Sequence, residues 1–256
     1  MTRHDRLRSM SLRNLIRLFW VVLAILWACF WFGHLEALGG WWALLSALLV
    51  IVVGIAVANV LARRSLRRFR KALSVGDIPV ARQEHANLVD FWRRRGRETM
   101  KAYGINILLL EERYEEALKE LEGLDSKKLG KTGSPVIQNQ IACCKALLGD
   151  PAKAIELSQS VLPRLESIGP DYSASGHLVL GIANFLIGRP SEAVSHLQTA
   201  YTTSRDVPTR KAMAAFYLGE ALSAAGKPTE AREAYQNANE ALPNGRFGMR
   251  ALERLK

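Results

Sequence analysis

An internal repeat with a period of 36 to 39 residues places the strongest constraint on the fold of this chain. In one unit, Gly181 stands twelve residues before Ala193, and a Gly188-Arg189-Pro190 break lies between them. Small residues let two helices approach closely, glycine supplies a tight turn, and proline is tolerated in the first turn of the next helix. The repeat therefore predicts a series of antiparallel helix pairs and an all-α fold. Five alanines on the second helices mark its register: Ala81, Ala117, Ala154, Ala193 and Ala231.

The last unit carries the residues of a known repeat family. It resembles the tetratricopeptide repeat (TPR), whose period is about 34 residues, so the units here are slightly long. The resemblance covers about residues 74–243 and implies an α-solenoid of TPR-like helix pairs. The aromatic residue that opens the family's motif is replaced here by Gln138, His177 and Ala215. The matching positions are Leu218-Gly219, Leu222, Ala231, Tyr235, Ala238 and Pro243.

Two apolar runs precede the repeats. Leu18 to Phe32 contains no charged residue, Trp41 to Ala62 is also uncharged, and only Gly33 to Gly40 connects them. A membrane-spanning helix needs about 20 predominantly apolar residues. The two runs therefore predict a two-helix transmembrane hairpin over residues 18–62. A cleaved signal peptide is disfavoured, because no small-residue cleavage site follows the first run.

The positive charge is concentrated around this predicted hairpin. Residues 1–71 carry eleven Lys and Arg against two acidic residues, whereas residues 72–256 carry 24 against 22. The positive-inside rule then places both termini in the cytoplasm and predicts a multi-pass protein of a bacterial-type inner membrane. Because the repeat region is nearly neutral, we expect no nucleic-acid partner. The basic residues after the second run are expected to contact anionic lipid headgroups: Arg63, Arg64, Arg67, Arg68, Arg70 and Lys71.

The chain divides into five expected parts. These are a cytoplasmic basic tail (1–17), the hairpin (18–62), a basic juxtamembrane linker (63–97), a TPR-like solenoid (98–243) and a C-terminal capping helix (244–256). In the linker, Leu66, Phe69 and Leu73 share one helical face, so it is either an ordinary stop-transfer flank or the first repeat. Residues 125–135 are expected to form a loop.

No pattern of catalytic or metal-binding residues is present. The five histidines are scattered, and the three cysteines lack the two-residue spacing of a zinc site. We therefore expect no enzyme activity, no cofactor, no metal and no small-molecule substrate.

The family resemblance implies that the first helices line a concave groove that holds a peptide or helix of a protein partner. The groove lacks the Lys and Arg of a carboxylate clamp, so an apolar extended segment or an amphipathic helix is expected. Leu178, Ile182 and Phe216 have an alternative role in packing between repeats. The expected groove residues are Asn106, Asn139, Leu178, Ile182, Phe185, Met213, Phe216 and Glu220.

These features together indicate a non-catalytic, membrane-anchored scaffold that recruits partner proteins at the cytoplasmic membrane surface. The alternative is an accessory subunit, in which the hairpin packs on a membrane enzyme or transporter and the repeats are regulatory. The repeat scaffold itself serves many functions and names no partner.

Overall fold

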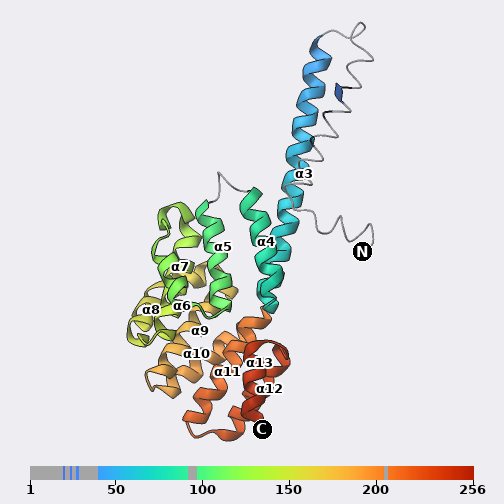
Figure 1. Ribbon diagram of the computed structural model, residues 1–256. Coiled ribbons are helices and arrows are strands. Elements are labelled where there is room, and N and C mark those ends of the chain that lie inside the picture. Colours follow the sequence, from blue (N-terminus) through green and yellow to red (C-terminus); the bar gives the residue numbers. More distant parts are fainter. Residues whose placement is uncertain (1–19, 21–23, 25–26, 29–39, 92–96, 205–206) are drawn as a thin grey trace. The chain divides into compact units, whose positions relative to one another are not determined.

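The described part of the chain is entirely helical (Figure 1). The computed structural model describes residues 20, 24, 27–28, 40–91, 97–204 and 207–256. The chain divides into two compact units. The smaller unit comprises residues 1–69 and 83–97, and the larger unit comprises residues 70–82 and 98–256. Over these described residues no strand occurs, so the all-α class is confirmed. A short 3₁₀ helix (Ser126–Leu129) accompanies the α-helices, which are α3 (Gly40–Val75), α4 (Ile78–Phe91), α5 (Arg97–Leu110), α6 (Tyr114–Glu122), α7 (Gly130–Leu147), α8 (Pro151–Ile168), α9 (Pro170–Leu186), α10 (Pro190–Thr203), α11 (Pro208–Ala224), α12 (Pro228–Ala241) and α13 (Arg246–Leu255).

The same turn joins the two helices of each successive pair. Its central residue has a left-handed backbone, with φ of 72° at Gly76, 58° at Glu112, 97° at Gly149, 82° at Gly188 and 75° at Gly226. The next residue donates its N–H to a carbonyl five residues earlier, the bond that closes a Schellman motif, as Asp150 does to Lys145 at 2.8 Å.

Five residues after each turn centre stands the alanine that marks the repeat. All five of these alanines are at most 2% exposed, including Ala81 in the first pair. The register predicted from the alanine spacing is therefore confirmed. The segment that joins α3 to α4 has the same turn geometry as the later units.

Close approach of the two helices explains the small residues. A Cβ on Gly181 would lie 2.5 Å from Cγ of Leu197, and one on Gly219 would lie 2.5 Å from Cε1 of Tyr235. Neither contact is possible for a real side chain, so only glycine permits these helices to pack so tightly. The first two pairs differ, because the equivalent positions hold the buried side chains of Phe69 and Ile105.

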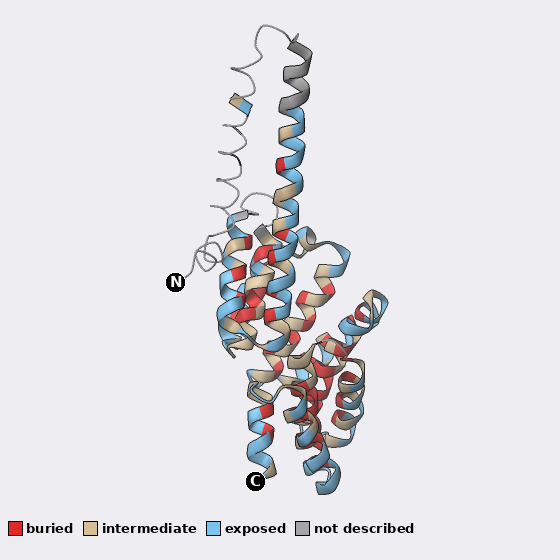
Figure 2. Ribbon diagram, turned by 90° about the vertical axis from the view of Figure 1, so that its right-hand side faces the viewer, coloured by how far each residue is buried: buried red, intermediate tan, exposed pale blue. Residues whose placement is uncertain are grey.

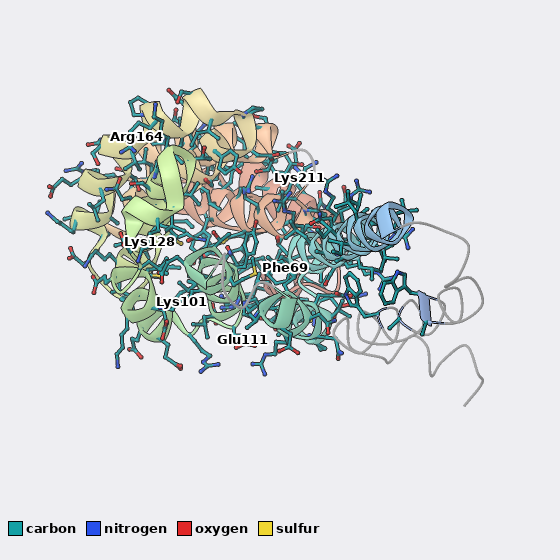
Figure 3. The ribbon with its side chains drawn as sticks, turned by 90° about the horizontal axis from the view of Figure 1, so that it is seen from above. Phe69, Lys101, Glu111, Lys128, Arg164 and Lys211 are labelled. Atoms are coloured by element: carbon teal, nitrogen blue, oxygen red, sulfur yellow. The ribbon has the colours of Figure 1, made fainter. Side chains whose placement is uncertain are left out.

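The helix pairs of the larger unit form two layers. The first helices α7, α9, α11 and α13 contact one another in succession and make an inner layer, against which α8, α10 and α12 pack. Alanines, leucines and aromatic side chains fill the space between the layers. Figure 2 marks the buried residues of these helices in red. Charged side chains cover the outer surface (Figure 3). This is the solenoid-like packing expected from the repeat.

Helices far apart in sequence also meet within the larger unit. Thr209, at the start of α11, donates its hydroxyl to the carbonyl of Leu73 at 3.5 Å, 136 residues away. Glu112, at the turn between α5 and α6, forms ion pairs with Arg246 and Arg250 of α13. In both cases, the turn within one helix pair contacts the start of the first helix of another pair, which lies four pairs further along the chain. The solenoid therefore comes back to its own beginning after about 135 residues.

The smaller unit contains the apolar part of α3. Leu48–Val75 is long and apolar enough to cross a membrane, and it is the one such helix among the described residues. Leu48, Leu49 and Ile55 are 55 to 64% exposed. The two-helix transmembrane hairpin and the multi-pass topology are not supported. The first apolar run lies outside the described residues, except for Trp20, Ala24, Trp27 and Ala28.

A buried polar contact joins α3 to α4 in the smaller unit. Ser65 donates its hydroxyl to Oε2 of Glu84, which is 8% exposed, and Arg68 lies 3.7 Å from the other carboxylate oxygen. A buried carboxylate needs such partners, because water no longer solvates it.

The expected loop at residues 125–135 is mostly helical. The 3₁₀ helix Ser126–Leu129 leads into α7, and Pro135 lies buried inside that helix. A proline so near the start of a helix removes only the hydrogen bond to Lys131, an exposed residue whose carbonyl water can reach. The loop prediction was therefore wrong.

Candidate functional site

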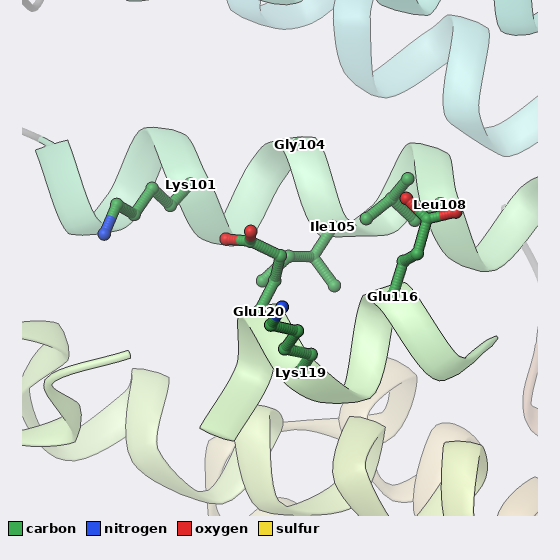
Figure 4. A pocket seen from close by; sticks show the side chains of 7 residues that line it. All are labelled: Lys101, Gly104, Ile105, Leu108, Glu116, Lys119 and Glu120. Carbon is green, nitrogen blue, oxygen red and sulfur yellow. The ribbon is translucent and has the colours of Figure 1, made fainter. Parts of the chain in front are cut away.

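The inner layer of the larger unit is the candidate site, because amide and aromatic side chains gather on its helices. Among the described residues, no cluster of three or more His, Cys, Asp or Glu side chains could hold a metal ion. A depression of about 400 Å³ lies between α5 and α6, lined by Ile105 and Leu108 (Figure 4). Two lysines and two glutamates also line it, so its charges balance and select no ligand of either sign.

Three of the eight expected groove residues are core residues instead. Leu178, Ile182 and Phe216 are at most 7% exposed and belong to the main hydrophobic cluster. They pack between helix pairs, which is the alternative role that the sequence left open. Phe185 and Met213 lie at the edge of this cluster and are partly exposed.

Glu220 is engaged within the protein. Its carboxylate accepts a hydrogen bond from the Tyr235 hydroxyl at 2.8 Å and from Arg254 of α13 at 3.0 Å. The neighbouring carboxylate raises the pKa of Tyr235, although burial is the larger cause of that shift. Glu220 is thus part of the contact between α11, α12 and α13.

A row of amide side chains links α5, α7 and α9. Gln140 donates to Oδ1 of Asn106 at 2.9 Å, and Asn106 donates to the carbonyl of Ala102 at 2.9 Å. Asn139 donates to the Ser175 hydroxyl at 3.4 Å. The sequence indicated Asn106 and Asn139 but missed Gln140, although it directly follows Asn139.

Two oxygens in this row have no partner within the described protein. Oδ1 of Asn139 and Oε1 of Gln140 are buried and accept no hydrogen bond. A buried acceptor left unpaired costs about 1–3 kcal/mol, so such groups normally meet a donor.

Aromatic side chains gather at the other end of the inner layer. The Tyr217 ring lies 6.3 Å from Phe185, 5.5 Å from Phe216 and 5.9 Å from Phe247 of α13. These separations are typical of favourable edge-to-face and tilted pairs. Sequence reasoning missed Tyr217, which stands in the motif directly before the Leu218-Gly219 pair.

A polar cluster adjoins these rings. Glu112 accepts a hydrogen bond from the Tyr114 hydroxyl at 3.3 Å and forms ion pairs with Arg246 and Arg250. The guanidinium carbons of these two arginines lie 5.4 and 5.8 Å from the ring centroid of Phe247. Burial, together with the charge of Arg250, lowers the pKa of Arg246 to about 10. Burial raises the pKa of Tyr114, and the adjacent Cys143 adds to this effect.

The basic residues after the apolar part of α3 form one group along the helix. All six residues of this group are exposed. Arg68 also lies 3.7 Å from Glu84, and Arg70 donates to the Tyr103 hydroxyl at 3.4 Å. The contact of this group with lipid headgroups stays a prediction.

Two of the scattered histidines meet in the structure. His177 on α9 and His196 on α10 lie with their Nδ1 atoms 3.0 Å apart, and Glu166 is 3.8 Å from Nε2 of His177. Two imidazoles alone do not complete the ligand set of a structural metal site. The pair is therefore a partly buried contact between two helices.

Comparison with known proteins identifies the fold but no family. No family model matches the chain, and no curated protein matches it. The chain is similar to the crystal structure of Bacillus thuringiensis PlcR in complex with the peptide PapR7 and DNA, with a TM-score of 0.60 and 17% sequence identity over 75% of this chain and 72% of that chain. The described helices and this likeness are consistent with TPR-like repeats.

The comparison also corrects one expectation. The near-neutral repeat region led us to exclude nucleic acid as a partner, but the similar PlcR structure contains DNA. A chain with this fold therefore occurs in a complex with nucleic acid, and the net charge of a region does not exclude such a partner. The exclusion was wrong.

Proposed function

We propose that this protein is a non-catalytic, membrane-anchored helical scaffold whose inner helices bind an extended peptide segment of a partner protein. The observation that carries the proposal is the row of amide side chains on the inner helices, in which Asn106 and Gln140 are partly exposed. An extended peptide offers a regular series of backbone N–H and C=O groups, with which partly exposed amide side chains can form hydrogen bonds. The peptide in the similar PlcR complex supports this class of ligand.

Partly exposed apolar side chains elsewhere on the inner helices define the preferred peptide. Phe185 and Met213 are partly exposed beside the main hydrophobic cluster. Apolar side chains of a bound segment would pack against them, while its backbone meets the amides. The proposed ligand is therefore an extended segment with apolar side chains.

Membrane anchoring is the second part of the proposal. Apolar side chains cover the exposed surface of α3 between Leu48 and Val60, and exposed arginines follow at once. A helix that exposes this much apolar surface is unfavourable in water and favourable in a bilayer. The arginines then favour the cytoplasmic, anionic leaflet.

A binding experiment tests the peptide part. The full chain, held in lipid nanodiscs, is used to select from a random peptide library, and the affinity of an enriched peptide is measured by fluorescence anisotropy. Asn106→Ala and Gln140→Ala are expected to weaken binding about tenfold each, since one hydrogen bond is worth about 1.4 kcal/mol. Gln159→Ala, which removes an exposed amide from the outer helix α8, is the matched control.

Two outcomes would overturn this part. One is equal affinity in all three variants. The other is that the protein retains DNA from a random duplex pool in a parallel selection, while no peptide is enriched from the peptide library.

Lipid analysis tests the anchor. The full chain is expected to stay in the membrane after alkaline carbonate extraction and to retain anionic lipid when purified in mild detergent. Replacing Arg63, Arg64 and Arg67 with Gln should reduce the retained anionic lipid at least tenfold, because each basic residue contributes about 1 kcal/mol. Replacing Lys131, Lys153 and Arg164 with Gln removes the same charge from exposed positions of the larger unit and should change nothing. Extraction of the full chain by carbonate would refute the anchor.

A further inference from the structure

In the smaller unit, α4 runs antiparallel beside α3 (Figure 1). Glu84 of α4 accepts a hydrogen bond from Ser65 of α3 and lies 3.7 Å from Arg68. The rings of Phe69 and His85 are 6.0 Å apart. Because the two helices are antiparallel, the C-terminal end of α4 lies nearer to the apolar part of α3 than its N-terminal end does.

The contacts of Glu84 give the level on α3 at which α4 ends. Val89 lies five residues beyond Glu84, about 7.5 Å further along α4 at a rise of about 1.5 Å per residue. The same distance along α3, counted back from Ser65 and Arg68, reaches residues 60–63. Val89 therefore lies level with this part of α3.

Residues 60–63 are also the place where α3 leaves its apolar run. The uncharged run from Trp41 to Ala62 has 22 residues, which is about 33 Å of helix. The hydrocarbon core of a bilayer is about 30 Å thick, so nearly the whole run is needed to cross it. The edge of the hydrocarbon core would therefore lie near Ala62, and Val89 lies at the level of that edge.

Val89 offers an apolar side chain at this level. It is 41% exposed, whereas the preceding residue, Leu88, is buried. An exposed valine gains no stabilisation from water, and contact with lipid would remove its apolar surface from water. Val60 of α3 is also exposed at the same level. Both helices therefore present an apolar side chain where the bilayer would end.

The charged residues near Val89 also favour a lipid surface. Arg63 and Arg64 are exposed on α3, and such long side chains reach the phosphate layer while their stems stay in the apolar region. Asp90 is the single acidic residue in the last turn of α4, and these two arginines outweigh its charge. The sequence after α4 continues with Trp92-Arg93-Arg94-Arg95, a composition that is favoured at the interface of an anionic membrane.

We propose that the last turn of α4 lies in the lipid headgroup layer, with Val89 at the edge of the hydrocarbon core, as a second membrane contact beside the spanning helix. This inference rests on the proposed membrane anchor and adds a second element to it. A single spanning helix can tilt and can shift along the membrane normal. The contact of α4 opposes both movements, because they would lift Val89 into water or push Asp90 into the hydrocarbon core.

The test measures the membrane depth of three exposed valines. Val52 lies in the middle of the apolar run of α3 and is 54% exposed, whereas Val80 and Val89 of α4 are 42% and 41% exposed. Each is replaced in turn (Val52→Cys, Val80→Cys or Val89→Cys) in the full chain with its three native cysteines changed to alanine, and the new thiol is labelled with the fluorophore NBD. The labelled chains are placed in nanodiscs of phosphatidylcholine and phosphatidylserine. These nanodiscs carry a nitroxide quencher either at the lipid headgroup or near the end of the acyl chain.

Val80→Cys and Val89→Cys form a matched pair, because the two valines are almost equally exposed on the same helix. The headgroup nitroxide should quench the label at position 89 at least about twofold more strongly than the label at position 80, because about 13 Å of helix separates them. The acyl-chain nitroxide should quench the label at position 52 and neither label on α4.

The three positions separate failure of this inference from failure of the anchor. Equal quenching of positions 80 and 89 by the headgroup nitroxide would overturn the inference. Stronger quenching of position 89 by the acyl-chain nitroxide than by the headgroup nitroxide would overturn it too, since α4 would then enter the hydrocarbon core. Both results leave the anchor standing while position 52 is quenched from the acyl chain. An unquenched label at position 52 would refute the anchor itself, and the inference with it.

Discussion

His177 and His196 face each other between α9 and α10 with their Nδ1 atoms 3.0 Å apart. At this distance one ring must donate and the other accept, so at least one imidazole is neutral. Burial lowers the pKa of both rings, and the proximity of His177 lowers that of His196 further, whereas Glu166 partly opposes the shift at His177.

The histidine pair predicts a loss of stability in mild acid. A histidine with a lowered pKa in the folded state binds fewer protons than it does unfolded, so stability falls as the pH drops below the unfolded value of about 6.5. The thermal midpoint of the full chain in detergent should therefore decrease between about pH 7.5 and pH 5.5. His196→Gln should show a smaller decrease, and an unchanged pH dependence would contradict this account.

The close contact at Gly181 predicts an unusual response to alanine. In an ordinary helix, Gly→Ala is stabilising by about 0.5–1 kcal/mol. Here the new Cβ would lie 2.5 Å from Leu197 Cγ and 3.1 Å from its backbone nitrogen, which cannot move freely. Gly181→Ala should therefore destabilise the fold by about 1–3 kcal/mol in urea unfolding. Gln198→Ala, on the exposed face of α10, is the control and should change stability by less than about 0.5 kcal/mol.

The buried Ser65–Glu84 contact predicts local loosening of α4. Ser65→Ala removes a hydrogen bond to a carboxylate that is 8% exposed and leaves it with Arg68 at 3.7 Å. The expected cost is about 1–3 kcal/mol. Hydrogen exchange over residues 83–91 should accelerate accordingly. Ser74→Ala, which loses only a bond to a carbonyl of its own helix, should leave this exchange unchanged.

The adjacent cysteines are predicted to be chemically inert. Burial raises the pKa of Cys143 and of Cys144 to about 12. The reactive thiolate fraction near pH 8 is then about a thousandfold below that of a free cysteine. Iodoacetamide should modify neither residue until the chain is unfolded, whereas a Ser160→Cys variant on the exposed face of α8 should react at once. Rapid modification of Cys144, which is fully buried whereas Cys143 is partly exposed, would contradict this account.

The repeat could be predicted from sequence because one backbone requirement recurs. A buried alanine lies five residues after each left-handed turn. The left-handed backbone at the turn and the burial of the alanine each restrict strongly which residue can occupy the position. The second turn is the exception, since Glu112 gives no glycine signal there. Its alanine, Ala117, still revealed the unit.

The candidate site was harder to predict, because it depends on which distant residues meet. Gln140 and Asn106 are 34 residues apart, and His177 and His196 are 19 apart, so neither pair forms a local motif. The expected groove mixed core and surface positions for the same reason. Phe216 and Phe185 lie on neighbouring inner helices, yet Phe216 is core and Phe185 is partly exposed.

The return of the solenoid onto itself sets the number of its units. Many repeat arrays can be lengthened or shortened, because each unit touches only its neighbours. Here Leu73 contacts Thr209 and Glu112 contacts Arg246. Each contact joins two helix pairs that lie four pairs apart in the array. Deleting or duplicating one helix pair would separate both partners at once. A unit inserted between these residues is therefore expected to break both contacts.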